Sequence, residues 1–269
     1  MENKIPFRFF VVTFLWSWVF WGALIIPGML NLPISNDYFQ AISLPLMIIG
    51  AFGPAVGAII SVYTIGGKSS VKSFLSRFLS LRFGLKTWLA IFFVLGGASI
   101  IAWLLPEFFG ADRIQTFFPS VFVFPLYIII TIFFGGGQEE IGWRGYISPY
   151  LEKKFGLIVG GLILGAIWAI WHLPLWFIAG SSQAYMNFFG FMLKTIGYSY
   201  FFSWVIKESG NRLFSGLVAH GVANAFVPLF PWIILADNVK QTRFWIHGII
   251  IIIIGITIVI TRTYKNREI

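Results

Sequence analysis

The chain has 269 residues, of which 58% are hydrophobic and only 11% are charged. Soluble domains carry roughly 25% charged residues, so this composition excludes an ordinary soluble domain and indicates a protein that crosses the membrane several times. The sequence contains no cysteine, which excludes disulfides, a thiolate nucleophile and a cysteine-held metal. The net charge of +9 fits the anionic surface of a membrane, and we expect no nucleic-acid partner.

Eight apolar segments come close to the roughly 20 residues that a helix needs to cross the hydrocarbon core. They cover residues 7–26, 39–64, 88–105, 123–151, 157–178, 188–206, 214–235 and 244–261. The sequence therefore predicts an all-α fold, a polytopic membrane helix bundle of about eight transmembrane helices. The fourth segment is the least regular, because glycines and glutamates interrupt it.

Basic residues concentrate in every second loop between these segments. Lys4 precedes the first segment and Arg8 lies at its start, for example, and Lys153 and Lys154 separate the fourth segment from the fifth. Because basic loops stay on the cytoplasmic side, we expect a multi-pass cell-membrane protein with both termini in the cytoplasm. Within the loop after the second segment, residues 71–82 place Lys or Arg at every fifth position among Phe and Leu, which predicts an amphipathic helix on the cytoplasmic surface.

Several ionisable or polar side chains fall inside the apolar segments. Such groups are costly in a membrane, usually face the bundle interior or a wet cavity, and mark candidate functional sites. They are Glu139, Glu140 and Arg144 in the fourth segment, His172 in the fifth, Lys194 in the sixth, and His220 and Asn224 in the seventh. Lys194 lies near the outer end of its segment and is expected to snorkel toward the surface.

Counting residues places four of these groups at a similar depth. The fourth and fifth segments form a hairpin that turns near residue 155, and Glu139 and His172 each lie about 16 residues from that turn, or roughly 25 Å along a helix. His220 and Asn224 lie about 8 and 12 residues after Arg212, where the seventh segment enters the membrane, or roughly 12–18 Å along a helix. Within the slack of helix tilt and loop length, the four side chains can meet at one level.

Helix geometry separates the two adjacent glutamates. Glu140 and Arg144 are four residues apart, in the acid-before-base order that pairs best on a helix, so they are expected to form an ion pair. Glu139 is rotated by about 100° from Glu140 and is left free to act. His220 and Asn224 are also four apart and share a helix face.

This set of side chains is typical of a hydrolase. A carboxylate beside an imidazole can hold and deprotonate a water molecule, and a histidine with an asparagine can stabilise an oxyanion. Alternatively, Glu139, His172 and His220 could hold a divalent metal such as zinc, which accepts nitrogen and oxygen ligands. Asparagine is a poor zinc ligand and the H-E-x-x-H spacing is absent, so we favour direct acid–base catalysis without a cofactor.

Three motifs in this order resemble those of the CPBP family. They are Glu-Glu-x-x-x-Arg at 139–144, aromatic-x-x-x-His at 168–172, and His-x-x-x-Asn at 220–224. The family comprises the type II CAAX prenyl proteases and bacterial relatives linked to bacteriocin processing and immunity, also called Abi proteins. Trp168 stands where the family's motif usually has Phe.

The resemblance implies an intramembrane endopeptidase with a cavity open toward the cytoplasm. Glu139 would activate water with help from His172, and His220 and Asn224 would form the oxyanion site. Glu140 and Arg144 would support the architecture. The substrate would be a membrane-embedded or lipidated peptide or protein. Short loops and the usage of Ile and Lys are typical of bacterial proteins, in which prenylated CaaX tails are not expected.

The predicted organisation has three parts. Residues 1–119 form N-terminal transmembrane helices with the amphipathic helix near 71–82, residues 120–235 form a CAAX-protease-like catalytic core, and residues 236–269 form a C-terminal transmembrane helix with a basic tail. Two other functions stay open. A non-catalytic bacteriocin-immunity or scaffold protein predicts eroded motifs, and a proton-coupled transporter predicts internal repeats with matching broken helices. Filled motif positions and the lack of a convincing repeat favour the endopeptidase.

Overall fold

The computed structural model describes residues 5–30, 35–118 and 120–265 of the chain. These residues form helices joined by turns and loops and contain no strand, which confirms the predicted all-α class. The helices are α1 (Phe7–Met29), α2 (Asn36–Ala51), α3 (Gly53–Ser76), α4 (Leu85–Leu104), α5 (Phe124–Phe134), α6 (Glu140–Gly142), α7 (Ser148–Trp171), α8 (Phe188–Glu208), α9 (Leu213–Leu229) and α10 (Thr242–Lys265). Short 3₁₀-helices and one π-helix connect several of them.

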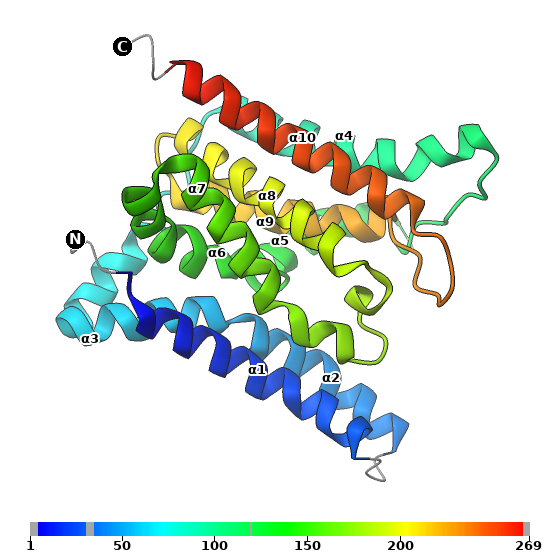
Figure 1. Ribbon diagram of the computed structural model, residues 1–269, viewed down its shortest axis with the longest axis horizontal. Helices are drawn as coiled ribbons and strands as arrows, with labels where there is room; N and C mark the ends of the chain where they lie inside the picture. The colour runs from blue at the N-terminus through cyan, green and yellow to red at the C-terminus, as the bar shows by residue number, and fades with distance from the viewer. Residues whose placement is uncertain (1–4, 31–34, 119, 266–269) are drawn as a thin grey trace.

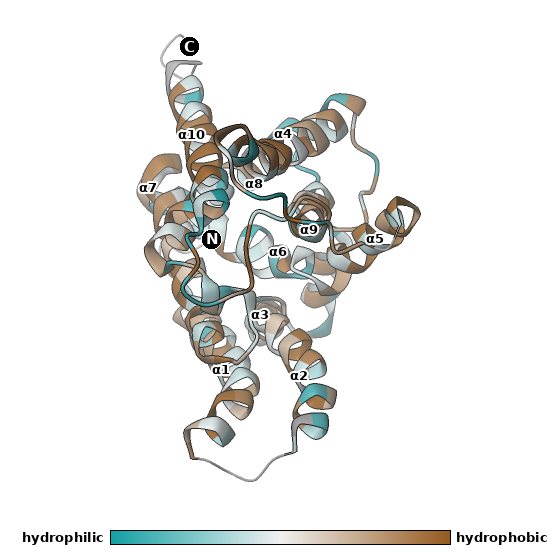
Figure 2. Ribbon diagram, turned by 90° about the vertical axis from the view of Figure 1, so that its right-hand side faces the viewer, coloured by the Kyte–Doolittle hydropathy of each residue, from teal (hydrophilic) through white to brown (hydrophobic). Residues whose placement is uncertain are grey.

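The helices run back and forth between the two ends of one bundle (Figure 1). Helix α1 packs on α2 and α3 along one side, and α4 and α10 pack together on the opposite side. Helices α7, α8 and α9 lie between these groups, with α9 also in contact with α4 and α5. Hydrophobic residues occur along every long helix (Figure 2), and many large apolar side chains are exposed, as a lipid-facing bundle requires.

By length and composition, four stretches in the described ranges can cross a membrane, namely Phe7–Met29, Leu85–Phe109, Val121–Phe177 and Thr242–Arg262. A fifth is added if α2 and α3, bent by 41°, form one span. The stretch Val121–Phe177 has 57 residues and covers two predicted spans, which meet at the turn of Gly156 (φ +77°). The total of eight, which needs α8 and the 17-residue α9 as further spans, stays a prediction.

The fourth predicted span is broken where its glycines occur. Helix α5 ends at Phe134, and the chain resumes as a 3₁₀-helix at Gly137–Glu139, then α6, then a π-helix at Trp143–Ile147. Gly136 has φ +122°, a conformation that favours glycine. A Cβ at Gly142 would collide with the carbonyl of Pro54, so α6 and α3 approach closely there. The break therefore lies inside the bundle, against the start of α3.

The predicted amphipathic helix over residues 71–82 is shorter in the structure. Helix α3 is kinked at Gly66 and Gly67 and continues to Ser76, and residues 77–84 form a turn and a loop. Phe78 leaves the helical path and is buried against Gly145, where an added Cβ would lie 2.5 Å from its ring. This long-range packing ends the helix before the pattern of basic residues does.

The prediction that Lys194 snorkels outward is wrong. Lys194 is only 4% exposed, and its Nζ lies 4.0 Å from the centre of the Trp232 ring. The rings of Phe191 and Phe244 lie 5.2 and 5.5 Å away. Because the loop after α9 folds Trp232 onto α8, cation–π contacts replace solvent around the ammonium group.

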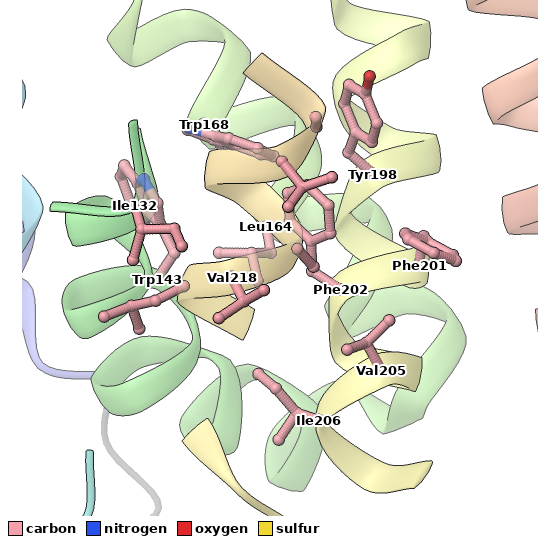
Figure 3. Close-up of a cluster of buried hydrophobic side chains, with 14 of the residues drawn as sticks. Ile132, Trp143, Leu164, Trp168, Tyr198, Phe201, Phe202, Val205, Ile206 and Val218 are labelled. Atoms are coloured by element: carbon pink, nitrogen blue, oxygen red, sulfur yellow. The ribbon is translucent and has the colours of Figure 1, made fainter. Parts of the chain in front are cut away.

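A dense apolar cluster surrounds α9 and holds the helices that carry the polar groups (Figure 3). The cluster brings together Leu164 and Trp168 of α7, Phe202 of α8, Val218 of α9 and Trp143 of the π-helix. Well-packed side chains of this kind lock rotamers. The cluster therefore fixes the polar side chains that emerge from the same helices.

Candidate active site

Glu139 lies at the end of the 3₁₀-helix that follows the glycine break. Glu139 is only 4% exposed, and its Oε2 accepts a hydrogen bond of 2.8 Å from Nε1 of Trp168 on α7. The indole of Trp143 also interacts with this carboxylate, but Trp168 makes the well-formed hydrogen bond among the described residues. One oxygen of this carboxylate is therefore held by the protein, and the other can bind a water molecule.

Glu140 connects two basic side chains within the bundle. Its Oε1 accepts a 2.9 Å hydrogen bond from Nη1 of Arg144, so the ion pair expected from the sequence spacing is present. The same oxygen lies 2.9 Å from Nδ1 of His220 on α9. Since a carboxylate only accepts hydrogen bonds, Nδ1 of His220 is the donor. Glu140 thus orients the histidine as well as the arginine.

His172 caps the C-terminal end of α7. The helix stops at Trp171 because Pro174 follows shortly after and cannot donate a backbone hydrogen bond. The ring Nδ1 of His172 lies 2.9 Å from the carbonyl oxygen of Trp168, and a carbonyl only accepts, so Nδ1 carries the proton. In the neutral ring, Nε2 then has a free lone pair that can accept a hydrogen bond.

Asn224 and His220 converge on the space beside Gly136. Nδ2 of Asn224 donates a 2.7 Å hydrogen bond to the carbonyl of Gly135, which leaves its second N–H free. A Cβ built on Gly136 would lie 2.5 Å from Nδ2 of Asn224 and 2.6 Å from Nε2 of His220. Both nitrogens therefore lie close against the backbone of Gly136, where any side chain would collide with them.

A cavity of about 230 Å³ adjoins these groups. Glu139, His172 and Asn224 line it, together with Gly135 and Gly136. The remaining wall is mostly apolar and comes from α1, α2 and the ends of α5 and α7, with one polar contribution from the loop after α7. Its members are Trp21, Leu44, Met47, Ile48, Ala51, Phe134, Trp171, Leu175 and Gln183. The cytoplasmic opening expected for this cavity stays a prediction.

Helix α1 is fastened to the end of α7 by polar contacts behind the cavity wall. Nε1 of Trp171 donates a 2.8 Å hydrogen bond to Oγ of Ser17, which in turn donates to the carbonyl of Gly50 at 2.7 Å. The rings of Trp21 and Trp171 lie 4.8 Å apart. These contacts fix the part of the cavity wall formed by Trp21 and Trp171, and none of the side chains in them is charged.

The alternative of a metal site has little geometric support. Among the residues that the structure describes, no three His, Asp or Glu side chains are arranged to hold a metal ion. Each of the three candidate ligands, Glu139, His172 and His220, uses one polar atom in a hydrogen bond to another residue of the protein. Ligating histidines also use their second ring nitrogen in this way, so the choice between a metal and a metal-free mechanism stays a prediction.

The structure brings together the six candidate site residues, whereas Lys194 lies apart from them against Trp232. Glu139, His172 and Asn224 face one cavity, and His220 meets them through Gly136 and is joined to Glu140 and Arg144. Sequence reasoning missed two contributions. Gly136 has no side chain, which lets the nitrogens of Asn224 and His220 approach its backbone, and Trp168 binds Glu139 directly. The run of three glycines before the glutamates was the signal for the first of these.

Replacing Gly136 by alanine is expected to lower kcat by about 10²–10³-fold, the usual cost of losing an oxyanion donor. The methyl group would occupy the space that Asn224 and His220 share. Gly110→Ala is the matched control, because Gly110 also has positive φ (+83°) and no atom within 4 Å of its added Cβ. Initial rates and melting temperatures of both variants check the prediction, and equal rates would contradict it.

Comparison with known proteins identifies relatives of this chain. Residues 120–226, which include all six residues of the site, match the family model described as type II CAAX prenyl endopeptidase Rce1-like. The chain is 24% identical over 231 residues to CAAX prenyl protease 2 of the archaeon Methanococcus maripaludis, an alignment that covers 81% of this chain and 82% of the relative. With the three motifs and their convergence in the bundle, these similarities support the resemblance to the CPBP family of membrane proteases.

Proposed function

We propose that the chain is an intramembrane endopeptidase in which Glu139 activates the attacking water. The family match and the archaeal relative support the general activity, and the residue roles are part of the proposal. The observation that carries it is the cavity lined by Glu139, His172 and Asn224. Gly136 also lines this cavity, and Nε2 of His220 lies close to Gly136.

Water activation is assigned to Glu139 and His172. A water molecule in the cavity donates one hydrogen bond to Oε1 of Glu139, while Trp168 holds Oε2. The second hydrogen of the water is directed to Nε2 of His172. As the water oxygen attacks the peptide carbonyl, its proton passes to Glu139 and then to the leaving amine nitrogen. The carboxylate is regenerated, and one water is divided between the two products.

Oxyanion stabilisation is assigned to Asn224 and His220. Nδ2 of Asn224 and Nε2 of His220 both lie close to Gly136, which lines the cavity. Because Nδ1 of His220 donates to Glu140, Nε2 donates to the oxyanion when both ring nitrogens carry a proton. Preorganised donors placed where charge develops contribute about 2.7–4 kcal/mol each.

The chemistry of the cavity limits the substrate. Apolar side chains of α1 and α2, such as Trp21, Leu44 and Ile48, face the catalytic groups and fit apolar residues of a substrate chain. Such a substrate is a membrane-embedded or lipidated peptide. The name of the archaeal relative makes a lipidated C-terminal tail the first substrate to test.

The proposal is tested by incubating the purified protein in vesicles with matched peptides. A peptide with a lipidated cysteine near its C-terminus, the same peptide without the lipid, and a transmembrane peptide are compared, and the products are identified by mass spectrometry. Cleavage at one peptide bond, lost in Glu139→Gln, is expected. Proton or solute flux without cleavage of any peptide would support a transporter instead, and neither activity would favour a scaffold.

Removing metal ions is expected to change the rate by less than about twofold, since the proposed steps use only side chains. The protein is treated with a strong divalent-metal chelator, desalted, and assayed beside an untreated sample. A zinc-dependent protease of known chelator sensitivity is the control. A rate that falls tenfold and returns when zinc is added would contradict the metal-free mechanism.

A further inference from the structure

A second cavity, of about 280 Å³, lies at the end of the bundle where α1 begins and α10 ends. It is bounded by the end of α3, the π-helix, the start of α7, the end of α8 and the start of α9. Three basic side chains line it, Arg77, Arg144 and Lys207, against one carboxylate, Glu152. Glu152 is engaged by Lys207 at 3.0 Å and by Ser148 at 3.0 Å. The cavity therefore has an excess of positive charge.

Arg144 presents an unpaired edge of its guanidinium. Nη1 is bound to Glu140, but Nε and Nη2 are buried with no hydrogen-bond partner among the described residues. The arginine side chain is only 2% exposed, and the rings of Trp168 and Phe202 lie 4.7 and 5.3 Å from its Cζ. Buried donors without acceptors are costly. The paired Nε and Nη2 donors match the two oxygens of a carboxylate or phosphate.

An apolar groove of about 490 Å³ adjoins this cavity. The two share Arg77 and Pro149 as lining residues. The groove runs between α3 and α7 and is lined largely by apolar and aromatic side chains, including Val62, Ile65 and Phe74. Its apolar lining and its position at the bundle surface fit a hydrocarbon chain rather than a soluble anion.

We propose that an anionic phospholipid occupies both spaces, with its phosphate between Arg77, Arg144 and Lys207 and one acyl chain in the groove. The adjoining groove favours a lipid over a free phosphate or the C-terminal carboxylate of a peptide. Helices α3 and α7, whose ends line the cavity, carry further basic residues that attract anionic headgroups, Lys68 and Lys72 on α3 and Lys154 on α7. Basic pockets between membrane helices bind such headgroups.

The lipid would act on the catalytic groups through Arg144. Nη1 of Arg144 and Nδ1 of His220 both donate to Glu140. A phosphate bound to Nε and Nη2 of Arg144 would fix the orientation of the guanidinium, and through Glu140 that of His220. We expect the bound lipid to raise kcat and to leave KM unchanged, because it positions His220 and does not touch substrate. The lipid site goes beyond the proposed function, and its binding can be measured without any protease assay.

The test measures lipid binding to the full chain in nanodiscs of phosphatidylcholine with increasing phosphatidylglycerol, by native mass spectrometry of the retained lipids. The double variant Arg77→Gln/Lys207→Gln is compared with Lys68→Gln/Lys72→Gln, which removes the same charge from exposed positions at the same end. The first is expected to weaken phosphatidylglycerol binding by about tenfold to thirtyfold and the second by less than about twofold. Equal losses in the two double variants would overturn the site.

A second arm separates the lipid from other anions. Val62→Trp narrows the groove and is expected to weaken binding of long-chain phosphatidylglycerol but not of its dihexanoyl analogue. Inorganic phosphate, and a hexapeptide with a free or an amidated C-terminus, are added as competitors. Displacement of the lipid by the free-acid peptide alone, with no effect of Val62→Trp, would overturn the lipid assignment in favour of a peptide terminus. Lipid binding that survives while Glu139→Gln stays fully active would refute the catalytic roles and leave the lipid site standing.

Discussion

Replacing Glu139 by glutamine is expected to lower kcat by about 10²–10⁴-fold, the range that a positioned general base contributes. Glutamine keeps the size of the side chain, and its amide oxygen can still accept the hydrogen bond from Trp168. It cannot take a proton from water, so the loss should appear in kcat with little change in KM. Because the residue is buried and the substitution is isosteric, the fold should be retained, which a melting curve checks.

The matched control for this variant is Glu208→Gln, which removes a glutamate that is half exposed at the end of α8. Its rate should stay within about twofold of the unchanged protein, since surface substitutions have small effects. If Glu139→Gln and Glu208→Gln were equally active, Glu139 would have no part in the chemistry.

Replacing Glu140 by alanine is expected to destabilise the folded protein by about 3–5 kcal/mol, the cost of leaving one partner of a buried ion pair uncompensated. The side chains of Glu140 and Arg144 are 0% and 2% exposed, and Glu140 also holds Nδ1 of His220. Two groups would lose their partner at once. Unfolding in mixed micelles with increasing denaturing detergent measures the free-energy change.

A double-mutant cycle separates this pair from general damage to the core. Arg144→Met removes the charge and keeps an unbranched side chain next to the Trp168 ring. The double variant Glu140→Ala/Arg144→Met should cost less than the sum of the two single changes, because neither charge is then left alone. Strict additivity of the two free-energy changes would show that the ion pair does not contribute as a pair.

The parts of the site that depend on local spacing could be predicted from the sequence. Glu140 and Arg144 face one another because they are four residues apart, and the contact persists although a π-helix interrupts the α-helix there. Motif order likewise indicated which helices would meet. The second partner of Glu140 could not be predicted, because His220 is 80 residues away and reaches it only when α9 packs against the glycine break.

The remaining differences arise from packing between distant segments. The spacing of basic residues at 71–82 predicted a helix on the membrane surface. In the structure, Phe78 is buried against Gly145, and α3 ends at Ser76. Rules on membrane depth placed Lys194 at the surface, whereas the ring of Trp232 covers its ammonium group. Each case involves a contact between residues far apart in the chain, which local periodicity does not contain.

A single turnover in water enriched in ¹⁸O, with excess enzyme, tests whether Glu139 activates the attacking water. If Glu139 activates water for direct attack, the new C-terminal carboxylate of the product carries one ¹⁸O and the Glu139 side chain carries none. Mass spectrometry of the product and of the enzyme peptide that contains Glu139 measures both. An unlabelled product together with ¹⁸O in Glu139 would contradict the account, because the glutamate itself would then have attacked the peptide bond.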